Sequence, residues 1–280
     1  MQPVKRVSVH GGHSGQFCCH ATDLLEDIVR AYIEEGFEWV GLTEHIPPLE
    51  DRFRYPEEIA AGLSADQLYR RFERYIAAGR HLQQKYARAV RLYVGFETEA
   101  WSGSIDFVRR MERFFRPDYI VGSVHHVEDV GFDTSPAEYA RAVAAAGSLE
   151  AFYCRYFDLQ HHFLAAARPQ VVGHFDLVRI FDPDYPTTIA QPAVQRRVRR
   201  NLELVRSLGA ILDVNVRALD KGAVEPYPTR SILEQAVELG IPMAPGDDSH
   251  GVATVGRHID RAIAVLRDIG ADLNWRRPDF

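Results

Sequence analysis

Short runs of consecutive apolar residues alternate along this chain with longer segments in which apolar residues recur every three or four positions. Consecutive apolar residues are typical of strands buried on both faces, whereas the longer spacing is typical of amphipathic helices. The pattern predicts seven strands, at residues 7–9, 39–43, 91–96, 119–124, 171–173, 210–215 and 241–245. It predicts helices at about residues 24–33, with Thr22 or Asp23 as the N-cap, and at 65–86, 104–115, 192–208, 231–239 and 255–269, with further helical structure within 135–167.

Alternating strands and helices are typical of a parallel sheet covered by helices, either an open doubly wound sheet or a closed barrel. An open sheet usually forms its site at one point where the strand order reverses. Here, residues that can bind metal follow six of the seven predicted strands, and only a ring of strands brings six carboxyl ends together. We therefore expect an α/β fold, a distorted seven-stranded (β/α)7 TIM-like barrel, in which residues 1–280 form a single domain.

Composition and charge narrow the choice of partners and location. The chain has 280 residues, a formal net charge of −6 and no basic tract, which argues against nucleic acid or an anionic membrane as partner. Its N-terminal residues lack the apolar segment of a secretory signal, and no apolar run approaches the length of a membrane span. The sequence leaves the oligomeric state open.

The cysteines Cys18, Cys19 and Cys154 are odd in number, and two of them are adjacent. Reduced thiols in a cytoplasmic protein are therefore the favoured interpretation. A metal-binding Cys18–Cys19 pair is disfavoured, because histidines at better spacing lie nearby.

Histidines are concentrated where the predicted strands end. Three fall within eleven residues after the first strand, among glycines that let the backbone bend: His10, His13 and His20. Four more follow later strands directly or within a few residues: His45, His125, His174 and His250. Neutral imidazole is a good ligand for Zn, Fe, Ni and Cu, so this pattern favours a transition-metal site over a set of structural histidines.

Two carboxylates complete the candidate ligands. Glu97 ends the third predicted strand, and Asp248 shares one side of an extended backbone with His250, two residues later. Seven histidines and two carboxylates exceed the three or four protein ligands that one zinc ion usually takes. The sequence therefore predicts two or three ions with a bridging carboxylate. Ions about 3.5–4 Å apart can activate a shared water and stabilise an in-line phosphoryl displacement, which favours hydrolysis.

Six segments, in order along the chain, resemble the motifs of the PHP (polymerase and histidinol phosphatase) superfamily and especially its histidinol-phosphate phosphatases: VHGGHSGQFCCHA, GLTEHIPP, YVGFETE, VGSVHH, VVGHFDLVR and GDDSH. The resemblance covers essentially the whole chain. It implies a distorted seven-stranded barrel with three divalent metal ions (Zn, Fe or Mn). The implied ligands are His10, His13, Glu97 and Asp248 for the first ion, Glu97, His125 and His174 for the second, and His20, His45 and His250 for the third.

The implied reaction converts L-histidinol phosphate and water to L-histidinol and phosphate, with attack by a metal-bridging hydroxide. The resemblance thus implies a small phosphorylated molecule as the partner. A protonated acid or a metal-bound water must assist the leaving alkoxide, and the candidate side chains are Asp248, His126 and Asp176.

Three departures from the family pattern concern the first ligand and the phosphate site. The common His-x-His opening is His-Gly-Gly-His here, Asp220 stands where an arginine is expected, and Gly251 stands at another frequent arginine position. The remaining candidates for binding phosphate are Arg179, Arg217, Lys221 and Arg257. Hydrolysis of another sugar or nucleotide phosphate is therefore an alternative, followed by a metal-dependent amidohydrolase and a non-catalytic, metal-stabilised binding module.

Overall fold

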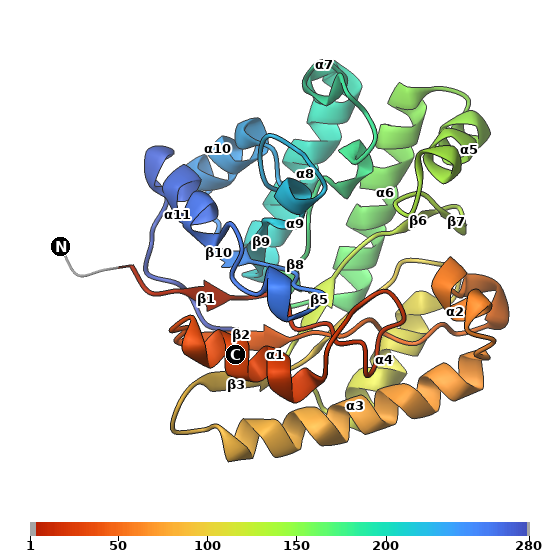
Figure 1. The fold of residues 1–280 in the computed structure, drawn as a ribbon. Coiled ribbons are helices and arrows are strands. Elements are labelled where there is room, and N and C mark those ends of the chain that lie inside the picture. Colours follow the sequence, from red (N-terminus) through yellow and green to blue (C-terminus); the bar gives the residue numbers. More distant parts are fainter. Residues whose placement is uncertain (1–3, 279–280) are drawn as a thin grey trace.

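The computed structural model describes residues 4–278, which form two parallel sheets and one short antiparallel pair (Figure 1). The first sheet has the order β1 (Val7–Ser8), β2 (Trp39–Leu42) and β3 (Arg91–Val94). The second has the order β10 (Met243–Gly246), β9 (Ile211–Asn215), β8 (Val171–Val172), β5 (Ile120–Gly122) and β4 (Phe96–Glu97). The antiparallel pair consists of β6 (His126–Val127) and β7 (Val130–Gly131).

Helices connect the parallel strands and cover their outer faces. In order they are α1 (Leu25–Glu34), α2 (Pro56–Ala60), α3 (Ala65–Lys85), α4 (Ser104–Phe115), α5 (Pro136–Ala146), α6 (Leu149–Ala167), α7 (Tyr185–Ala190), α8 (Pro192–Leu208), α9 (Arg217–Asp220), α10 (Arg230–Glu238) and α11 (Ile259–Asp268). Short 3₁₀ turns lie at Asp51–Phe53, Leu177–Arg179 and Val252–Thr254. In Figure 1, α1 and α3 lie with β1–β3, whereas α6, α8 and α10 lie with β8–β10.

The predicted α/β fold with parallel sheets is confirmed, and several boundaries differ. Within residues 4–278 the strand pairing forms two sheets rather than one closed ring, because the third predicted strand is divided at Gly95 into β3 and β4 and because β1 and β10 are not paired as strands. The last helix begins at Ile259 instead of 255, after His258 adopts a left-handed conformation. The N-cap of α1 is Leu24, and the Asp23 carboxylate instead accepts a hydrogen bond from the Val252 amide at 2.9 Å.

Direct contacts join the two sheets at both of their edges. Gly95 alone separates β3 from β4 along the chain. At the other edge, the amide of Val9, just after β1, donates a hydrogen bond to the carbonyl of Pro245 in β10 at 2.9 Å. Two residues beyond the end of each strand, the Asp248 amide donates a hydrogen bond to the His10 carbonyl at 2.8 Å. The ends of the two sheets are therefore held next to each other where the candidate metal ligands begin.

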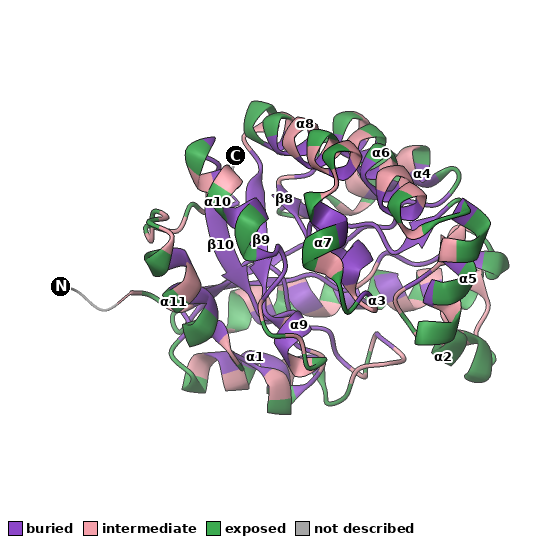
Figure 2. Cartoon of the chain, turned by 90° about the horizontal axis from the view of Figure 1, so that it is seen from above, coloured by how far each residue is buried: buried purple, intermediate pink, exposed green. Residues whose placement is uncertain are grey.

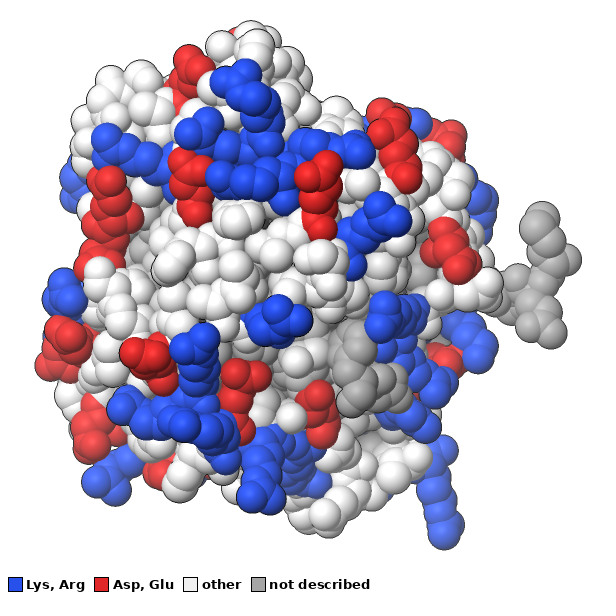
Figure 3. Space-filling model, turned by 180° about the vertical axis from the view of Figure 1, so that it is seen from behind, with Lys and Arg blue, Asp and Glu red and all other residues white. Residues whose placement is uncertain are grey.

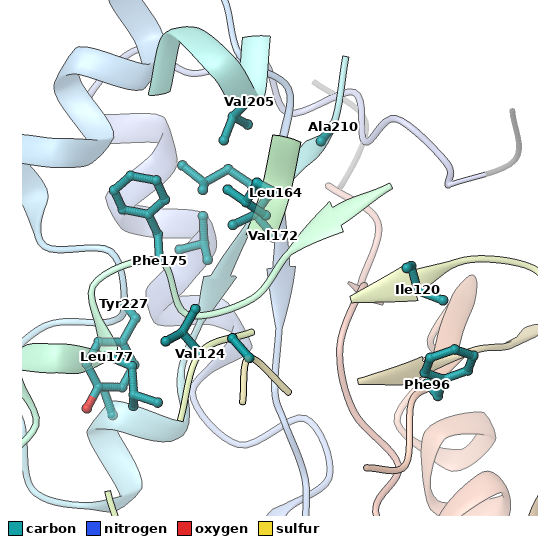
Figure 4. Close-up of a cluster of buried hydrophobic side chains, with 14 of the residues drawn as sticks. Phe96, Ile120, Val124, Leu164, Val172, Phe175, Leu177, Val205, Ala210 and Tyr227 are labelled. Carbon is teal, nitrogen blue, oxygen red and sulfur yellow. The ribbon is translucent and has the colours of Figure 1, made fainter. Parts of the chain in front are cut away.

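Two separate hydrophobic clusters flank the strands. The larger one lies between strands and helices, where Leu164 of α6 and Val205 of α8 pack around Val172 of β8 (Figure 4). The smaller one receives side chains from or beside strands of both sheets: Val7, Val9, Trp39, Tyr93, Tyr119, Val121, Val171, Ile211 and Ala244. Burial of apolar side chains on both faces explains why the strands are continuous apolar runs.

The outer surface is polar and mixed in charge. Figure 2 shows buried strands surrounded by helices whose outward faces are exposed. On the face drawn in Figure 3, basic and acidic side chains are interspersed. Within residues 4–278, no helix has the length and apolar character needed to cross a membrane.

Packing of Tyr119 against Gly41 gives a test of the smaller cluster. The Tyr119 hydroxyl donates a hydrogen bond to the Val9 carbonyl at 2.6 Å, and a Cβ at Gly41 would lie 1.6 Å from that hydroxyl oxygen. We expect Gly41→Ala to lower the free energy of unfolding by about 1–3 kcal/mol, because the tyrosine must move. The measurement is urea denaturation of a double-mutant cycle. Gly41→Ala should lower the free energy of unfolding less in a Tyr119→Phe background, which lacks the obstructing oxygen. An equal decrease in both backgrounds would contradict this account.

Candidate metal centre

The structure brings all nine candidate metal ligands together at the carboxyl ends of the parallel strands. Glu97 belongs to β4, and the others lie in the segments that follow β1, β2, β5, β8 and β10. Their ligand atoms form overlapping groups within 4.8 Å: His10–His13–Glu97, His10–His174–Asp248, His13–Asp248–His250, Glu97–His125–His174, and His20–His45–His250 together with Cys18. Side chains from both sheets therefore meet in one cluster.

The Glu97 carboxylate lies at the centre of this cluster and is 1% exposed. Its Oε1 lies 2.8 Å from His174 Nε2 and 3.3 Å from His125 Nε2. Its Oε2 lies 2.9 Å from His45 Nδ1 and 3.4 Å from His10 Nε2. Burial opposes ionisation, but His10, His45 and His125 outweigh it and lower the pKa of Glu97 well below its usual range. An ionised carboxylate with imidazoles on both oxygens is suited to bridge two cations.

Asp248 is the second carboxylate in the cluster. Its Oδ1 lies 3.3 Å from His13 Nε2, and its Oδ2 accepts a hydrogen bond from Asn215 Nδ2 at 3.2 Å. Burial would raise the pKa of Asp248, but His10, His13 and His250 lower it well below its usual range. Its φ of +46° is uncommon for a residue with a side chain and is typical of strained functional positions.

His20, His45 and His250 form the most open part of the cluster. His20 Nε2 lies 3.2 Å from His45 Nε2, and the rings of His20 and His250 stack with centroids 5.0 Å apart. Burial is the main reason that the pKa of His20 falls to about 2, and it also lowers the pKa of His250. Arg217 contributes to both shifts. The rings of His20 and His250 are therefore neutral and keep lone pairs for a metal ion.

The altered spacing in the first motif still places both histidines in the cluster. Gly12 has a φ of +76°, and a Cβ there would lie 2.7 Å from Leu42 Cδ2. The resulting turn leaves the His10 and His13 ring centroids 5.7 Å apart. The second glycine of the insertion thus compensates for the extra residue, because it alone fits the left-handed turn against β2.

Three buried carboxylates behind the histidines were missed by the sequence interpretation. Asp213 Oδ2 lies 3.0 Å from His10 Nδ1, and Glu99 Oε2 lies 2.9 Å from His125 Nδ1. Glu44 Oε2 lies 3.6 Å from His13 Nδ1. Such partners orient an imidazole so that its other nitrogen faces the metal. Alternation along a strand could have revealed Glu99, because it lies two residues after Glu97 and hence on the same side.

The carboxylates also set the charge of two histidines in the metal-free protein. Burial alone would lower the pKa of His10, but Glu97 and Asp248 outweigh it and raise the pKa well above its usual value. For His13, Asp248 and Glu44 overcome burial and raise the pKa to about 9. Both rings therefore hold a proton at neutral pH that an incoming metal ion would replace.

Buried polar atoms without hydrogen-bond partners provide a direct test of whether metal ions fit here. These atoms include His10 Nε2, His13 Nε2 and Asp248 Oδ1. Leaving such atoms unpaired in the interior is costly, and a cation would satisfy all three. Imidazole nitrogens and carboxylate oxygens are also the donors preferred by zinc and by the other metals considered above. The residues present therefore fit a metal centre.

A cavity of about 220 Å³ opens directly onto the cluster. Two of the four candidate phosphate-binding side chains, Arg217 and Lys221, line it together with Asn215. Tyr55, Tyr227 and Leu177 provide less polar walls, and Glu57 and Asp133 supply carboxylates. The cavity thus combines metal ligands, cationic groups and anionic groups in a space suited to a small molecule.

The structure does not place Arg179 among the cavity-lining residues. Its guanidinium lies between the rings of Tyr185 and Tyr227, 4.5 and 4.4 Å from their centroids. It donates hydrogen bonds to the carbonyls of Glu225 and Pro226. Asp176, a candidate acid, is fully buried and accepts hydrogen bonds from Arg179 Nε and from the Thr229 amide. Both side chains therefore support the wall that carries Tyr227.

The remaining candidates for phosphate binding and proton donation are Arg257, His126 and Asp248, and each has different surroundings. Arg257 lies outside the cavity lining and contacts Asp220 Oδ1 at 3.2 Å. His126 also lies outside the lining, with its Nδ1 3.3 Å from Glu99 Oε2. Asp248 alone of the three candidate acids lines the cavity, but its lowered pKa favours the role of metal ligand over that of proton donor.

The sequence model of the PHP domain matches residues 11–217 of this chain. The chain belongs to the PHP domain family. A PHP-domain relative from Schizosaccharomyces pombe, named as a probable histidinol-phosphatase, is 34% identical over 268 residues, which cover 94% of this chain and 87% of the relative.

Solved structures show the same PHP fold. One from Listeria monocytogenes has a TM-score of 0.82 and 27% identity, with coverage of 91% of this chain and 99% of that chain. Another, a histidinol phosphate phosphatase from Lactococcus lactis in complex with zinc, L-histidinol and phosphate, has a TM-score of 0.72 and 18% identity, with coverage of 96% and 95%. The cluster of nine candidate ligands therefore lies in a fold that is shared over almost the whole chain.

Substitution of Glu99 tests whether the outer carboxylates support the metal centre. We expect Glu99→Gln to weaken metal binding about 10–100-fold, because the neutral amide holds the His125 ring less firmly. Equilibrium dialysis with elemental analysis measures the affinity. Glu203→Gln on α8 is the matched control, since that carboxylate is exposed and pairs only with Arg199 among the described ion pairs. An affinity unchanged by Glu99→Gln would show that Glu99 does not orient His125.

Proposed function

We propose that this protein is a metal-dependent phosphomonoesterase that hydrolyses L-histidinol phosphate to L-histidinol and phosphate. The observation that carries the proposal is the clustering of nine potential metal ligands, seven of which line one small cavity. The similarity to a probable histidinol-phosphatase extends over 94% of the chain and supports this choice of reaction. A small phosphorylated molecule is accordingly the proposed partner.

The proposed cofactor is a set of three divalent ions, of Zn, Fe or Mn. We assign His10, His13, Glu97 and Asp248 to the first ion, Glu97, His125 and His174 to the second, and His20, His45 and His250 to the third. The short distances from Glu97 to four imidazoles support its role as a bridge. Bound ions would lower the pKa of a water and neutralise phosphoryl oxygens.

We further propose that the two parallel sheets belong to one distorted seven-stranded barrel, with residues 1–280 as a single domain. In this arrangement β3 and β4 count as one strand interrupted at Gly95. The hydrogen bond from the Val9 amide to the Pro245 carbonyl supports closure between β1 and β10. Residues from or beside seven successive strands share the smaller hydrophobic cluster, as expected for a barrel interior.

The cavity is lined by both cationic groups and carboxylates in addition to the candidate metal ligands. Arg217 lies close enough to His20 and His250 to lower the pKa of both rings, and Lys221 lies one turn further along the chain. We assign these two cations to the phosphate group, although Asp220 replaces the arginine common in the family. Guanidinium and ammonium groups bind phosphate through charge-assisted hydrogen bonds.

We assign Asp133 to the positively charged amino group of the substrate. Asp133 lines the cavity, and its Oδ1 is buried without a hydrogen-bond partner in the described structure. Its charge contributes to raising the pKa of Tyr55, after the larger effects of burial and Glu99. A cationic ligand group would relieve this unpaired carboxylate oxygen, so the cavity suits a phosphoester that also carries an amine.

Phosphate release from purified, metal-loaded protein tests the proposed reaction. L-Histidinol phosphate should be hydrolysed faster than a panel of sugar phosphates, nucleotides and p-nitrophenyl phosphate, and chelation should abolish release until metal is restored. Metal content is determined on the same samples. Fast turnover of another panel member with poor turnover of histidinol phosphate would favour the alternative substrate class, and no release from any member would contradict phosphomonoesterase activity.

Asp133→Asn tests the assignment of the amine. We expect kcat/KM for L-histidinol phosphate to fall about tenfold or more, because a charge-assisted hydrogen bond is lost. Hydrolysis of p-nitrophenyl phosphate, which lacks the amine, should change little. Glu128→Gln is the control, since this exposed carboxylate lies in the neighbouring β6–β7 hairpin and pairs with Arg155. An equal loss on both substrates would contradict a selective role for Asp133.

A further inference from the structure

Cys18 lies beside the histidine trio that we assign to the third ion. One ligand atom from each of Cys18, His20, His45 and His250 lies within 4.8 Å of the others. Cys18 is buried, with 7% of its surface exposed. The chain therefore places a thiol within reach of three imidazoles, and both cysteine sulfur and imidazole nitrogen are zinc ligands.

The local backbone orients the two adjacent cysteines differently. The Cys18 amide donates a hydrogen bond to the Ser14 carbonyl at 2.7 Å, and the His20 amide donates one to the Cys18 sulfur. Burial and the Glu44 carboxylate raise the pKa of the Cys18 thiol well above its usual value, and the His20 amide opposes this shift only in part, so the proton would leave only when a metal ion replaces it. Cys19, in contrast, contacts Arg71 Nη1 through its sulfur at 3.1 Å and belongs to none of the metal-binding groups. Only the first cysteine of the pair is available to the cluster.

Cavities on the two sides of the histidines indicate how a fourth ligand could coexist with substrate. His20 and His45 line both the main cavity and a second, much smaller one of about 20 Å³. Cys18 lines only the smaller cavity, whereas His250 and Arg217 line only the main one. A sulfur ligand would thus approach the ion from behind and leave the side facing the main cavity open.

We propose that the Cys18 thiolate is the fourth protein ligand of the ion held by His20, His45 and His250. The sulfur–metal bond forms as the S–H proton leaves to solvent, with no change in oxidation state. Zn–S and Zn–N bonds of about 2.3 and 2.0–2.1 Å require the four donor atoms to draw together by roughly 1 Å, which side-chain rotation can supply. The thiolate would add a soft, negatively charged ligand to the three imidazoles and favours zinc or iron over manganese at this position.

X-ray absorption of the zinc-loaded protein tests the proposal without any substitution. We expect a Zn–S scattering path at about 2.3 Å. Absence of that path in fully loaded protein would overturn the proposal, whatever the enzyme's activity.

Cobalt substitution identifies the cysteine. The cobalt-loaded protein should show near-ultraviolet sulfur-to-metal charge-transfer absorption, and Cys18→Ser should remove it and weaken binding of one ion by at least about tenfold. Cys19→Ser and Cys154→Ser are the controls and should retain the band. Loss of the band in Cys19→Ser instead, or its persistence in folded Cys18→Ser protein, would overturn the assignment. Neither measurement depends on the substrate, so a failure of the Cys18 proposal can be told apart from a failure of the phosphatase proposal.

Discussion

The buried negative charge of Glu97 is the constraint on which the rest of the site depends. A carboxylate that is 1% exposed is stable only when its charge is compensated, since transfer of an unpaired charge from water into the interior is very costly. The compensation comes from imidazoles that follow β1, β2, β5 and β8. These strands belong to both sheets, so one carboxylate ties the two sheets together at their carboxyl ends. The same arrangement creates the gap into which cations fit.

A second layer of charge stabilises the first. Asp213, Glu44 and Glu99 each face the far nitrogen of a different histidine, and each comes from or beside a different strand. Removal of one such partner would free a ring to turn without removing a ligand. The direction of each metal-facing nitrogen is thus determined by residues that never enter the cavity. Glu97 and Asp248, with smaller contributions from Asp213 and Glu44, also keep His10 and His13 protonated in the metal-free protein, so metal affinity and pH are coupled.

The strand periodicity and the ligand residue types were sufficient to predict the parallel α/β fold and the cluster at the strand ends. The sequence could not reveal that Gly95 divides one strand between two sheets, because that depends on hydrogen bonds to strands distant along the chain. The sequence also could not show which of the two arginines, Arg179 or Arg217, lines the cavity. Both are arginines shortly after a strand, yet one packs between two tyrosines and the other lines the cavity. Long side chains reach several ångströms from the backbone, so their endpoints are decided by packing that a linear pattern does not encode.

The hydroxyl of Tyr55 donates a hydrogen bond to Oε1 of Glu99, the same carboxylate whose Oε2 faces His125. Tyr55 lies immediately before α2, in the long connection between β2 and β3, and its ring also forms part of the cavity wall. One carboxylate therefore holds a wall of the cavity with one oxygen and a metal ligand with the other. Ordering of this connection and occupancy of the metal centre are thermodynamically linked through it, and by reciprocity each strengthens the other. The connection between β2 and β3, which supplies part of the cavity wall, thus also contributes to metal affinity.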